Sequence, residues 1–367
     1  MNQTISNDTD GMQLALEWAA KGMFTTTPNP RIGCVIVRDG VTLAAGHTQP
    51  AGQAHAEIQA LRDAEARGVD VRGATAYVTL EPCNHHGRTP PCSDALVRAR
   101  LGRVVAAMVD PNPLVAGQGL AKLEAAGIAV SSGVLAEQAY EMNIGFFSRM
   151  QRGRPWVRMK SAASLDGMTA LHNGQSQWIT GPQARADGHA WRARACAILT
   201  GIGTVKADDP QLNVRGLDTP RQPRRVVVDS KLEIDIDARI LQGAGCWIVA
   251  AAANPEKEAQ LRAAGHEVIV LPNEHGKVDL PALMLELGRR EINEVHVEAG
   301  AKLNGSLVRE GCVDELLVYL APCLIGEAQG MFALPALDSL ERKHTLAFHE
   351  VKQIGSDLRI LARFTHI

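Results

Sequence analysis

Three residues in the first part of the chain have the chemistry and the spacing of metal ligands. His55 begins the segment His55-Ala56-Glu57, and Cys83 and Cys92 flank a polar loop rich in proline and histidine. One imidazole and two thiolates suit Zn²⁺, and three protein ligands leave a fourth tetrahedral position open for water, as in catalytic zinc sites. Glu57 is surplus to the ligand set, so it could carry protons between that water and a substrate nitrogen. These residues predict a hydrolytic zinc site.

Two other interpretations of the same residues stay open. The metal could be a structural zinc ion that only fastens the loop, or no metal could bind. A structural site has no use for Glu57, and a loop of this polarity is a poor place for a core cysteine. His85 and His86, inside the loop, are rival ligands to the cysteines.

Helices and strands must alternate around these residues to position them. The sequence predicts helices over 11–22, with Asp10 as N-cap, and over 55–67, 92–101 and 117–126. Runs rich in β-branched residues predict strands over 32–38, 74–80 and 104–109. This alternation is typical of an α/β layer.

The composition indicates a globular protein of two or three domains. The chain has 367 residues, of which 46% are hydrophobic and 21% charged. Its net charge of −2 gives no bulk attraction to nucleic acid or to an anionic membrane. The longest apolar run, 246–253, is too short to span a bilayer, and the polar N-terminus lacks a secretory signal pattern. We expect a cytoplasmic protein that binds neither nucleic acid nor membranes.

The second half of the chain repeats the alternation and is predicted to be another α/β domain. Strands are expected near 197–200, 225–229, 246–251, 267–271, 294–298 and 315–321, separated by helices such as 183–194, 256–264 and 281–290. A basic stretch with glycine and proline places the boundary near 148–154, which gives domains of 1–150 and 151–367. The dinucleotide-binding pattern Gly-x-Gly-x-x-Gly does not follow the first strand of this domain. Glu298-Ala299-Gly300, between a strand and a helix, is a natural phosphate cradle.

The first domain carries a longer pattern around the proposed metal ligands. It combines His55-Ala56-Glu57 and Pro82-Cys83 with Cys92, and adds the segments 27–37 and 110–113. Zinc nucleobase deaminases have a similar pattern with two residues between the cysteines, whereas eight lie between Cys83 and Cys92 here. The longer spacing resembles the bacterial bifunctional riboflavin-biosynthesis deaminase/reductases. That resemblance implies a cytidine-deaminase-like three-layer α/β/α fold, zinc bound by His55, Cys83 and Cys92, Glu57 as the catalytic proton carrier, and Asn29 facing the pyrimidine.

The second domain resembles the reductase half of the same family, which has a dihydrofolate-reductase-like α/β fold and uses NADPH. The matching segments include 160–167, 176–180, 197–201, 203–212, 228–230 and 298–300. The resemblance implies that NADPH contacts Ala162, Trp178, Thr204, Asp208, Ser230 and Gly300. It implies that the substrate contacts Ser176, Arg192, Leu212, Arg215 and Glu298. Arginine presents a planar fork of donors that matches phosphate oxygens, so the two arginines suit a phosphorylated substrate. Lys160 and Asp208 are the catalytic candidates for the proton that accompanies hydride transfer.

The function implied is a two-step enzyme of riboflavin synthesis that requires Zn²⁺ and NADPH. Its first domain would deaminate 2,5-diamino-6-(5-phosphoribosylamino)pyrimidin-4-one, and its second would reduce the ribosyl group of the product to ribityl. A homo-oligomer is an expectation from the family alone. One alternative is a nucleic-acid base deaminase fused to a reductase-like domain, which the aromatic content of 4% disfavours. Another is a non-catalytic binding module with structural zinc.

Overall fold

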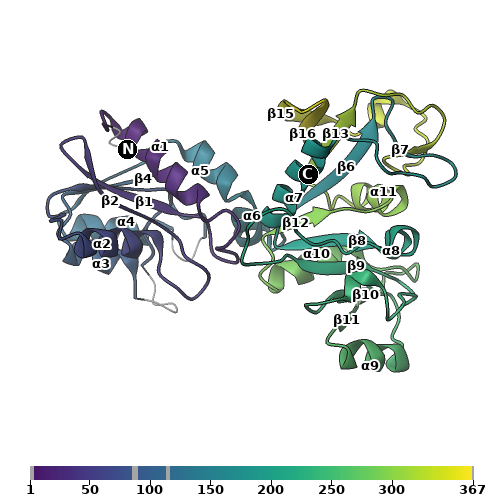
Figure 1. The fold of residues 1–367 in the computed structure, drawn as a ribbon. Coiled ribbons are helices and arrows are strands. Elements are labelled where there is room, and N and C mark those ends of the chain that lie inside the picture. The colour runs from purple at the N-terminus through teal and green to yellow at the C-terminus, as the bar shows by residue number, and fades with distance from the viewer. Residues whose placement is uncertain (1–3, 85–89, 113–115, 366–367) are drawn as a thin grey trace. The chain divides into compact units, whose positions relative to one another are not determined.

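The computed structural model describes residues 4–84, 90–112 and 116–365, and the chain divides into two compact units, 1–153 and 154–367 (Figure 1). The N-terminal unit contains helices α1 (Asp8–Ala20), α2 (Ala56–Ala66), α3 (Cys92–Arg98), α4 (Gln118–Ala125), α5 (Ala136–Met142) and α6 (Ile144–Arg152). Its strands are β1 (Gly33–Arg38), β2 (Val41–His47), β3 (Thr75–Val78), β4 (Arg103–Ala106) and β5 (Ala129–Ser132).

The five strands form one sheet with the order β2-β1-β3-β4-β5. Strand β1 pairs antiparallel with β2 and β3, whereas the pairs β3–β4 and β4–β5 are parallel. Successive side chains of a strand point to opposite faces. Cys34 and Ile36 therefore pack with α2, α3 and α4 in one core, and Val35 and Val37 pack with α1 and α5 in another. The unit has three α/β/α layers, as predicted.

Helix α1 begins earlier than the sequence predicts. The N-cap is Asn7, whose Oδ1 atom accepts a hydrogen bond of 3.0 Å from the backbone N–H of Asp10. The prediction of Asp10 as the cap is wrong, because Asp10 lies inside the first turn and instead accepts a hydrogen bond from the backbone of Ser6. The two side chains thus satisfy one backbone N–H in the first turn and one just before the N-cap.

The C-terminal unit contains helices α7 (Pro182–Arg194), α8 (Ile202–Asp208), α9 (Pro255–Ala263), α10 (Leu280–Arg289) and α11 (Ala301–Arg309), with short 3₁₀ helices η1 (Arg239–Leu241) and η2 (Leu340–Arg342). Its strands are β6 (Trp156–Ser164), β7 (Met168–Ala170), β8 (Ala197–Gly201), β9 (Arg224–Val228), β10 (Trp247–Ala250), β11 (Glu267–Val270), β12 (Glu294–Val297), β13 (Glu315–Ala321), β14 (Gln329–Gly330), β15 (Leu346–Ile354) and β16 (Asp357–Phe364).

Nine of these strands form a sheet with the order β11-β10-β9-β8-β12-β6-β13-β16-β15. All neighbours from β11 to β13 are parallel, and the β15–β16 hairpin is added antiparallel at one edge. Helices α10 and α11 cover a core that includes Met159, Leu199 and Val297. The α/β class predicted for this domain is confirmed.

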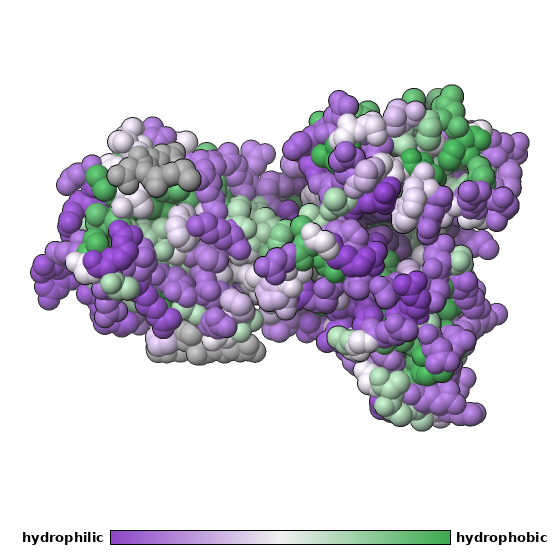
Figure 2. Space-filling model, viewed as in Figure 1, coloured by the Kyte–Doolittle hydropathy of each residue, from purple (hydrophilic) through white to green (hydrophobic). Residues whose placement is uncertain are grey.

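Most of the surface seen in Figure 2 is hydrophilic, and hydrophobic residues gather near β7 in the C-terminal unit. Two exposed leucines lie in the connections that lead to β7 and β14: Leu165, between β6 and β7, is 60% exposed, and Leu324, between β13 and β14, is 74% exposed. Among the described residues, no helix is both long enough and apolar enough to cross a membrane.

Candidate active sites

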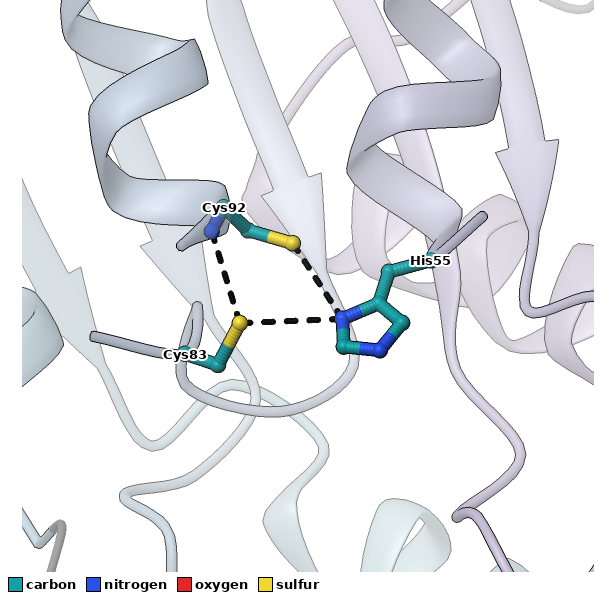
Figure 3. Close-up of side chains that lie close together, drawn as sticks. All are labelled: His55, Cys83 and Cys92. Atoms are coloured by element: carbon teal, nitrogen blue, oxygen red, sulfur yellow. Dashed lines mark hydrogen bonds between the residues drawn. The ribbon is translucent and has the colours of Figure 1, made fainter. Parts of the chain in front are cut away.

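The three predicted metal ligands lie together in the N-terminal unit (Figure 3). His55 caps α2 in an extended conformation, Cys83 follows β3, and Cys92 is the first residue of α3. The Nδ1 atom of His55 is 3.6 Å from the sulfur of Cys83 and 3.3 Å from that of Cys92. All three donor atoms lie within 4.8 Å of one another. One nitrogen and two sulfurs at this spacing fit a tetrahedral zinc ion with one further position free for water.

The start of α3 favours a thiolate at Cys83. The Cys92 side chain donates a hydrogen bond to Cys83, and with further bonds from His55 and the backbone N–H of Cys92 it lowers the pKa of Cys83 to about 4. The same contact and burial raise the pKa of the Cys92 thiol. These contacts favour the thiolate form of Cys83, which is the form that binds metals.

Glu57 lies on the first turn of α2 and is only 4% exposed. Burial, and the nearby charge of Cys83, raise its pKa from 4.5 to about 7. Its carboxyl also interacts with the Cys92 thiol. A buried carboxyl beside the ligand cluster can hold or release a proton near neutral pH, as its predicted role requires.

Asn29, the predicted pyrimidine contact, lies in the connection between α1 and β1. Its backbone N–H donates to the carbonyl of Thr26, and its own carbonyl accepts from the Thr26 hydroxyl. Two residues on, the buried Arg31 pairs through its backbone with the side-chain amide of Asn143. The loop is thus held at both ends. His85 and His86, the rival ligands, lie outside the described residues.

In the C-terminal unit, four of the six predicted NADPH residues lie at or near the carboxyl ends of neighbouring parallel strands. Strands β9, β8, β12 and β6 are parallel neighbours, so their carboxyl ends meet at one edge of the sheet. Ser230 lies just after β9, Thr204 on α8 after β8, Gly300 after β12, and Ala162 near the end of β6. Ligands of open α/β sheets bind at this edge. Gly300 caps α11 without a side chain, and a Cβ atom there would lie 3.7 Å from the Thr204 hydroxyl.

The predicted substrate residues Arg192 and Glu298 form a partly buried ion pair in the same unit, with side chains 15% and 13% exposed. The Nε and Nη2 atoms of Arg192 both donate to the Glu298 carboxylate, the second over 2.8 Å. Lys160, the predicted proton donor, lies 3.9 Å from the same carboxylate. Although burial raises it, the charges of Arg192 and Lys160 hold the pKa of Glu298 well below its usual range.

Arg215 joins this group through Asn213. Arg192 donates to the Asn213 carbonyl, and Arg215 donates to the Asn213 side-chain oxygen over 2.6 Å. Three of the five N–H groups of Arg192 are used in these contacts, whereas the Arg215 side chain is exposed.

Among the described residues, the other predicted residues make no hydrogen bond to the ion pair of Arg192 and Glu298. Ser176 and Trp178 follow β7, and the Trp178 ring is 70% exposed beneath the guanidinium of Arg185. Leu212 packs in a core with Val205. Asp208 ends α8 and is exposed.

Sequence reasoning missed three residues that contact the predicted substrate residues. Asn213 links the two arginines, and His189 accepts the backbone N–H of Arg215 at Nδ1 over 3.2 Å. His296 is buried with Nε2 3.2 Å from the Glu298 carboxylate. One signal was present in the sequence: His189 precedes Arg192 by three residues, so both lie on one face of a helix.

Comparison with known proteins bears on the whole chain. Residues 5–108 match the cytidine and deoxycytidylate deaminase zinc-binding region, and residues 155–360 match the RibD C-terminal domain. The chain is 46% identical to riboflavin biosynthesis protein RibD of Escherichia coli, over 95% of this chain and 96% of that protein. The chain belongs to the RibD family. The RibD of Haemophilus influenzae is 45% identical, over 97% of each chain.

Solved RibD structures share the fold along the full length. Acinetobacter baumannii RibD is 40% identical with a TM-score of 0.90, covering 98% of this chain and 99% of its own. The Thermotoga maritima enzyme, a diaminohydroxyphosphoribosylaminopyrimidine deaminase/5-amino-6-(5-phosphoribosylamino)uracil reductase, is 31% identical with a TM-score of 0.87, covering 97% and 98%. As a RibD family member, the chain is a bifunctional enzyme of riboflavin biosynthesis, with a zinc-dependent deaminase domain and an NADPH-dependent reductase domain. The alternative of a nucleic-acid base deaminase is not favoured.

Proposed function

We propose that the N-terminal domain deaminates 2,5-diamino-6-(5-phosphoribosylamino)pyrimidin-4-one, and that the C-terminal domain reduces the ribosyl group of the product to ribityl. The observation that carries the proposal is the cluster of His55, Cys83 and Cys92 beside the buried carboxyl of Glu57. Its chemistry suits hydrolytic removal of an amino group, and the Thermotoga relative is named for both reactions.

In the deaminase domain, His55, Cys83 and Cys92 would hold the zinc ion. Bound zinc acts as a Lewis acid that makes water a stronger nucleophile. Glu57 would take a proton from the attacking water and give one to the 2-amino nitrogen. Oxygen becomes bonded to the ring carbon, the carbon–nitrogen bond breaks, and ammonia leaves. Asn29, fixed by its loop contacts, would hydrogen-bond the pyrimidine edge and orient this carbon.

In the reductase domain, NADPH would bind at the carboxyl ends of the parallel strands β9, β8, β12 and β6. The first turn of α11 presents backbone N–H groups without a side-chain cap, and Gly300 leaves room beside Thr204. Both features fit a diphosphate. Ala162, Trp178, Asp208 and Ser230 would complete this site. NADPH supplies the hydride when bound.

For the substrate of the reductase, we infer different tasks for the two arginines from their contacts. Arg215 has an exposed guanidinium and would bind the 5-phosphate. Arg192 would hold Glu298 and the Asn213 segment in place, because its pairing with them leaves few N–H donors for the substrate. Ser176, Leu212 and Glu298 would contact the rest of the molecule. Lys160 or Asp208 would supply the proton that accompanies hydride transfer.

The substitution Glu57→Gln tests the deaminase assignment. It keeps the shape of the side chain and removes its ability to carry a proton. We expect a protein that retains one zinc ion and still oxidises NADPH with the deaminated substrate, but releases ammonia at least 100-fold more slowly. Undiminished ammonia release with zinc retained would refute the mechanism. If wild-type protein failed to oxidise NADPH with the deaminated substrate, the reductase assignment would fail.

We also propose that the protein acts in the cytoplasm as a homo-oligomer. All seven cysteines are free, which suits a reducing compartment. Strand β15 lies at the edge of the nine-stranded sheet and exposes Phe348, which is 75% accessible. A second copy pairing along this edge would cover that side chain. Sedimentation of wild-type protein and of Phe348→Lys tests this, since a wild-type monomer would exclude the oligomer.

A further inference from the structure

Glu81, two residues before the ligand Cys83, has a buried carboxylate that the proposed chemistry does not use. It is 6% exposed, and both carboxylate oxygens accept hydrogen bonds from backbone N–H groups. Oε2 accepts from Asp110 and Gly117 over 3.0 and 2.9 Å. Oε1 accepts from Gly119 and Leu120 over 2.7 and 3.3 Å.

These donors belong to a different part of the chain from Glu81 itself. Asp110 lies beyond the end of β4, and Gly117 to Leu120 form the beginning of α4. The N-terminus of a helix carries unpaired N–H groups and a partial positive charge, so a carboxylate is well matched to it. The backbone of Glu81 also donates to Met108. Glu81 therefore fastens the segment leaving β3 to the segment leaving β4 and to the start of α4.

The adjoining residue is packed against the same helix. A Cβ atom on Gly119 would lie 1.9 Å from the carbonyl oxygen of Pro82, so this contact exists only because residue 119 has no side chain. Cys83 itself is hydrogen-bonded to the start of α3. Its carbonyl accepts from the backbone N–H of Ser93, and its sulfur accepts from the backbone N–H of Cys92. The backbone that carries Cys83 is thus held between α4 and α3.

We propose that Glu81 is a positioning residue for the zinc site, which sets the place of the Cys83 sulfur by anchoring its backbone to the start of α4. The inference rests on the zinc site and is independent of the substrate. Removing a group that orients a metal ligand without binding the metal itself typically weakens metal affinity or activity 10–100-fold. Each carboxylate oxygen of Glu81 accepts two hydrogen bonds, and in Glu81→Gln one of these oxygens becomes an NH₂ group. That NH₂ group cannot accept, so two hydrogen bonds are lost and two backbone N–H groups face another donor.

The test measures zinc affinity of the full chain by competition with a chromophoric chelator. We expect Glu81→Gln to raise the zinc dissociation constant at least 10-fold, and excess zinc to restore deaminase activity. Gly119→Ala should act in the same direction, because it displaces Pro82 without changing any charge. Glu65→Gln, at an exposed position on α2, is the matched control and should bind zinc like the wild type. Reductase activity reports that the rest of the chain is folded.

A second readout follows the anchored backbone directly. Hydrogen exchange at the amides of Gly117 to Leu120 should become faster in Glu81→Gln and stay unchanged in Glu65→Gln. Zinc affinity of Glu81→Gln within twofold of wild type would overturn the inference. So would activity that excess zinc does not restore, since Glu81 would then be needed for folding of the domain and not for placing the ligand. Wild-type protein that binds no zinc would instead refute the proposed deaminase.

Discussion

His189 is a neutral side chain among positive charges. Burial, together with Arg192 and Arg215, lowers its pKa to about 4, against about 6.5 in an unfolded chain. The folded state therefore binds this proton less readily than the unfolded state, and acidification from pH 7 towards pH 4 favours unfolding. We expect the free energy of unfolding of the reductase unit to fall more steeply with acidification in wild type than in His189→Asn, which keeps an acceptor for Arg215. Urea titrations at pH 7, 6 and 5 measure this, and parallel curves would contradict it.

Arg192 and Arg215 should respond differently to replacement by alanine. Arg192→Ala leaves the Glu298 carboxylate without its main partner in a mostly buried place, which should cost about 2 kcal/mol of stability. Arg215→Ala removes an exposed side chain and should change stability by less than about 0.5 kcal/mol. It should instead raise KM for the phosphorylated substrate at least 10-fold, with KM for NADPH unchanged. Denaturation and steady-state kinetics separate the two outcomes, and an unaltered substrate KM would remove Arg215 from the phosphate site.

At the scale of one helix, the cap of α1 gives a direct test of where that helix begins. Asn7→Ala removes the acceptor for the Asp10 backbone N–H and should lower the stability of the N-terminal unit by about 1 kcal/mol. Gln13→Ala, at an exposed position inside the same helix, should have almost no effect. Urea denaturation of both variants measures the difference. Equal stabilities would show that the Asn7 side chain does not cap the helix.

The elements differ in how far the sequence could predict them. His55, Cys83 and Cys92 form a local pattern, so residue types and spacing are enough to propose the ligand set. The pairing of Arg192 with Glu298 joins residues 106 apart, and no local pattern marks it. Strand β15 was missed because most of its residues are exposed, so it lacks the alternating apolar pattern of a half-buried strand. His189 and Asn213 gain their roles only when the 213–215 segment docks on α7.

On the scale of the whole chain, each cofactor should stabilise the unit that binds it. NADPH at 100 times its dissociation constant should add about 2.7 kcal/mol to the stability of the C-terminal unit. Hydrogen exchange in the full chain should then slow in peptides from β8, β12 and α11, which surround the predicted site. Chelation of zinc should speed exchange around α2 and α3. Unchanged exchange near α11 with saturating NADPH would contradict the cofactor site.

Because of their order along the chain, the residues of the two sites are completed at different times during protein synthesis. The zinc ligands and Glu57 lie between residues 55 and 92, and their unit ends at Gly153. The predicted NADPH site is formed by the ends of β6, β8, β9 and β12, and β12 ends only at Val297. At about 5–20 residues per second, a ribosome needs roughly seven to thirty seconds to make residues 154–297. The metal centre can therefore fold and load on the nascent chain well before any pocket for the nicotinamide exists.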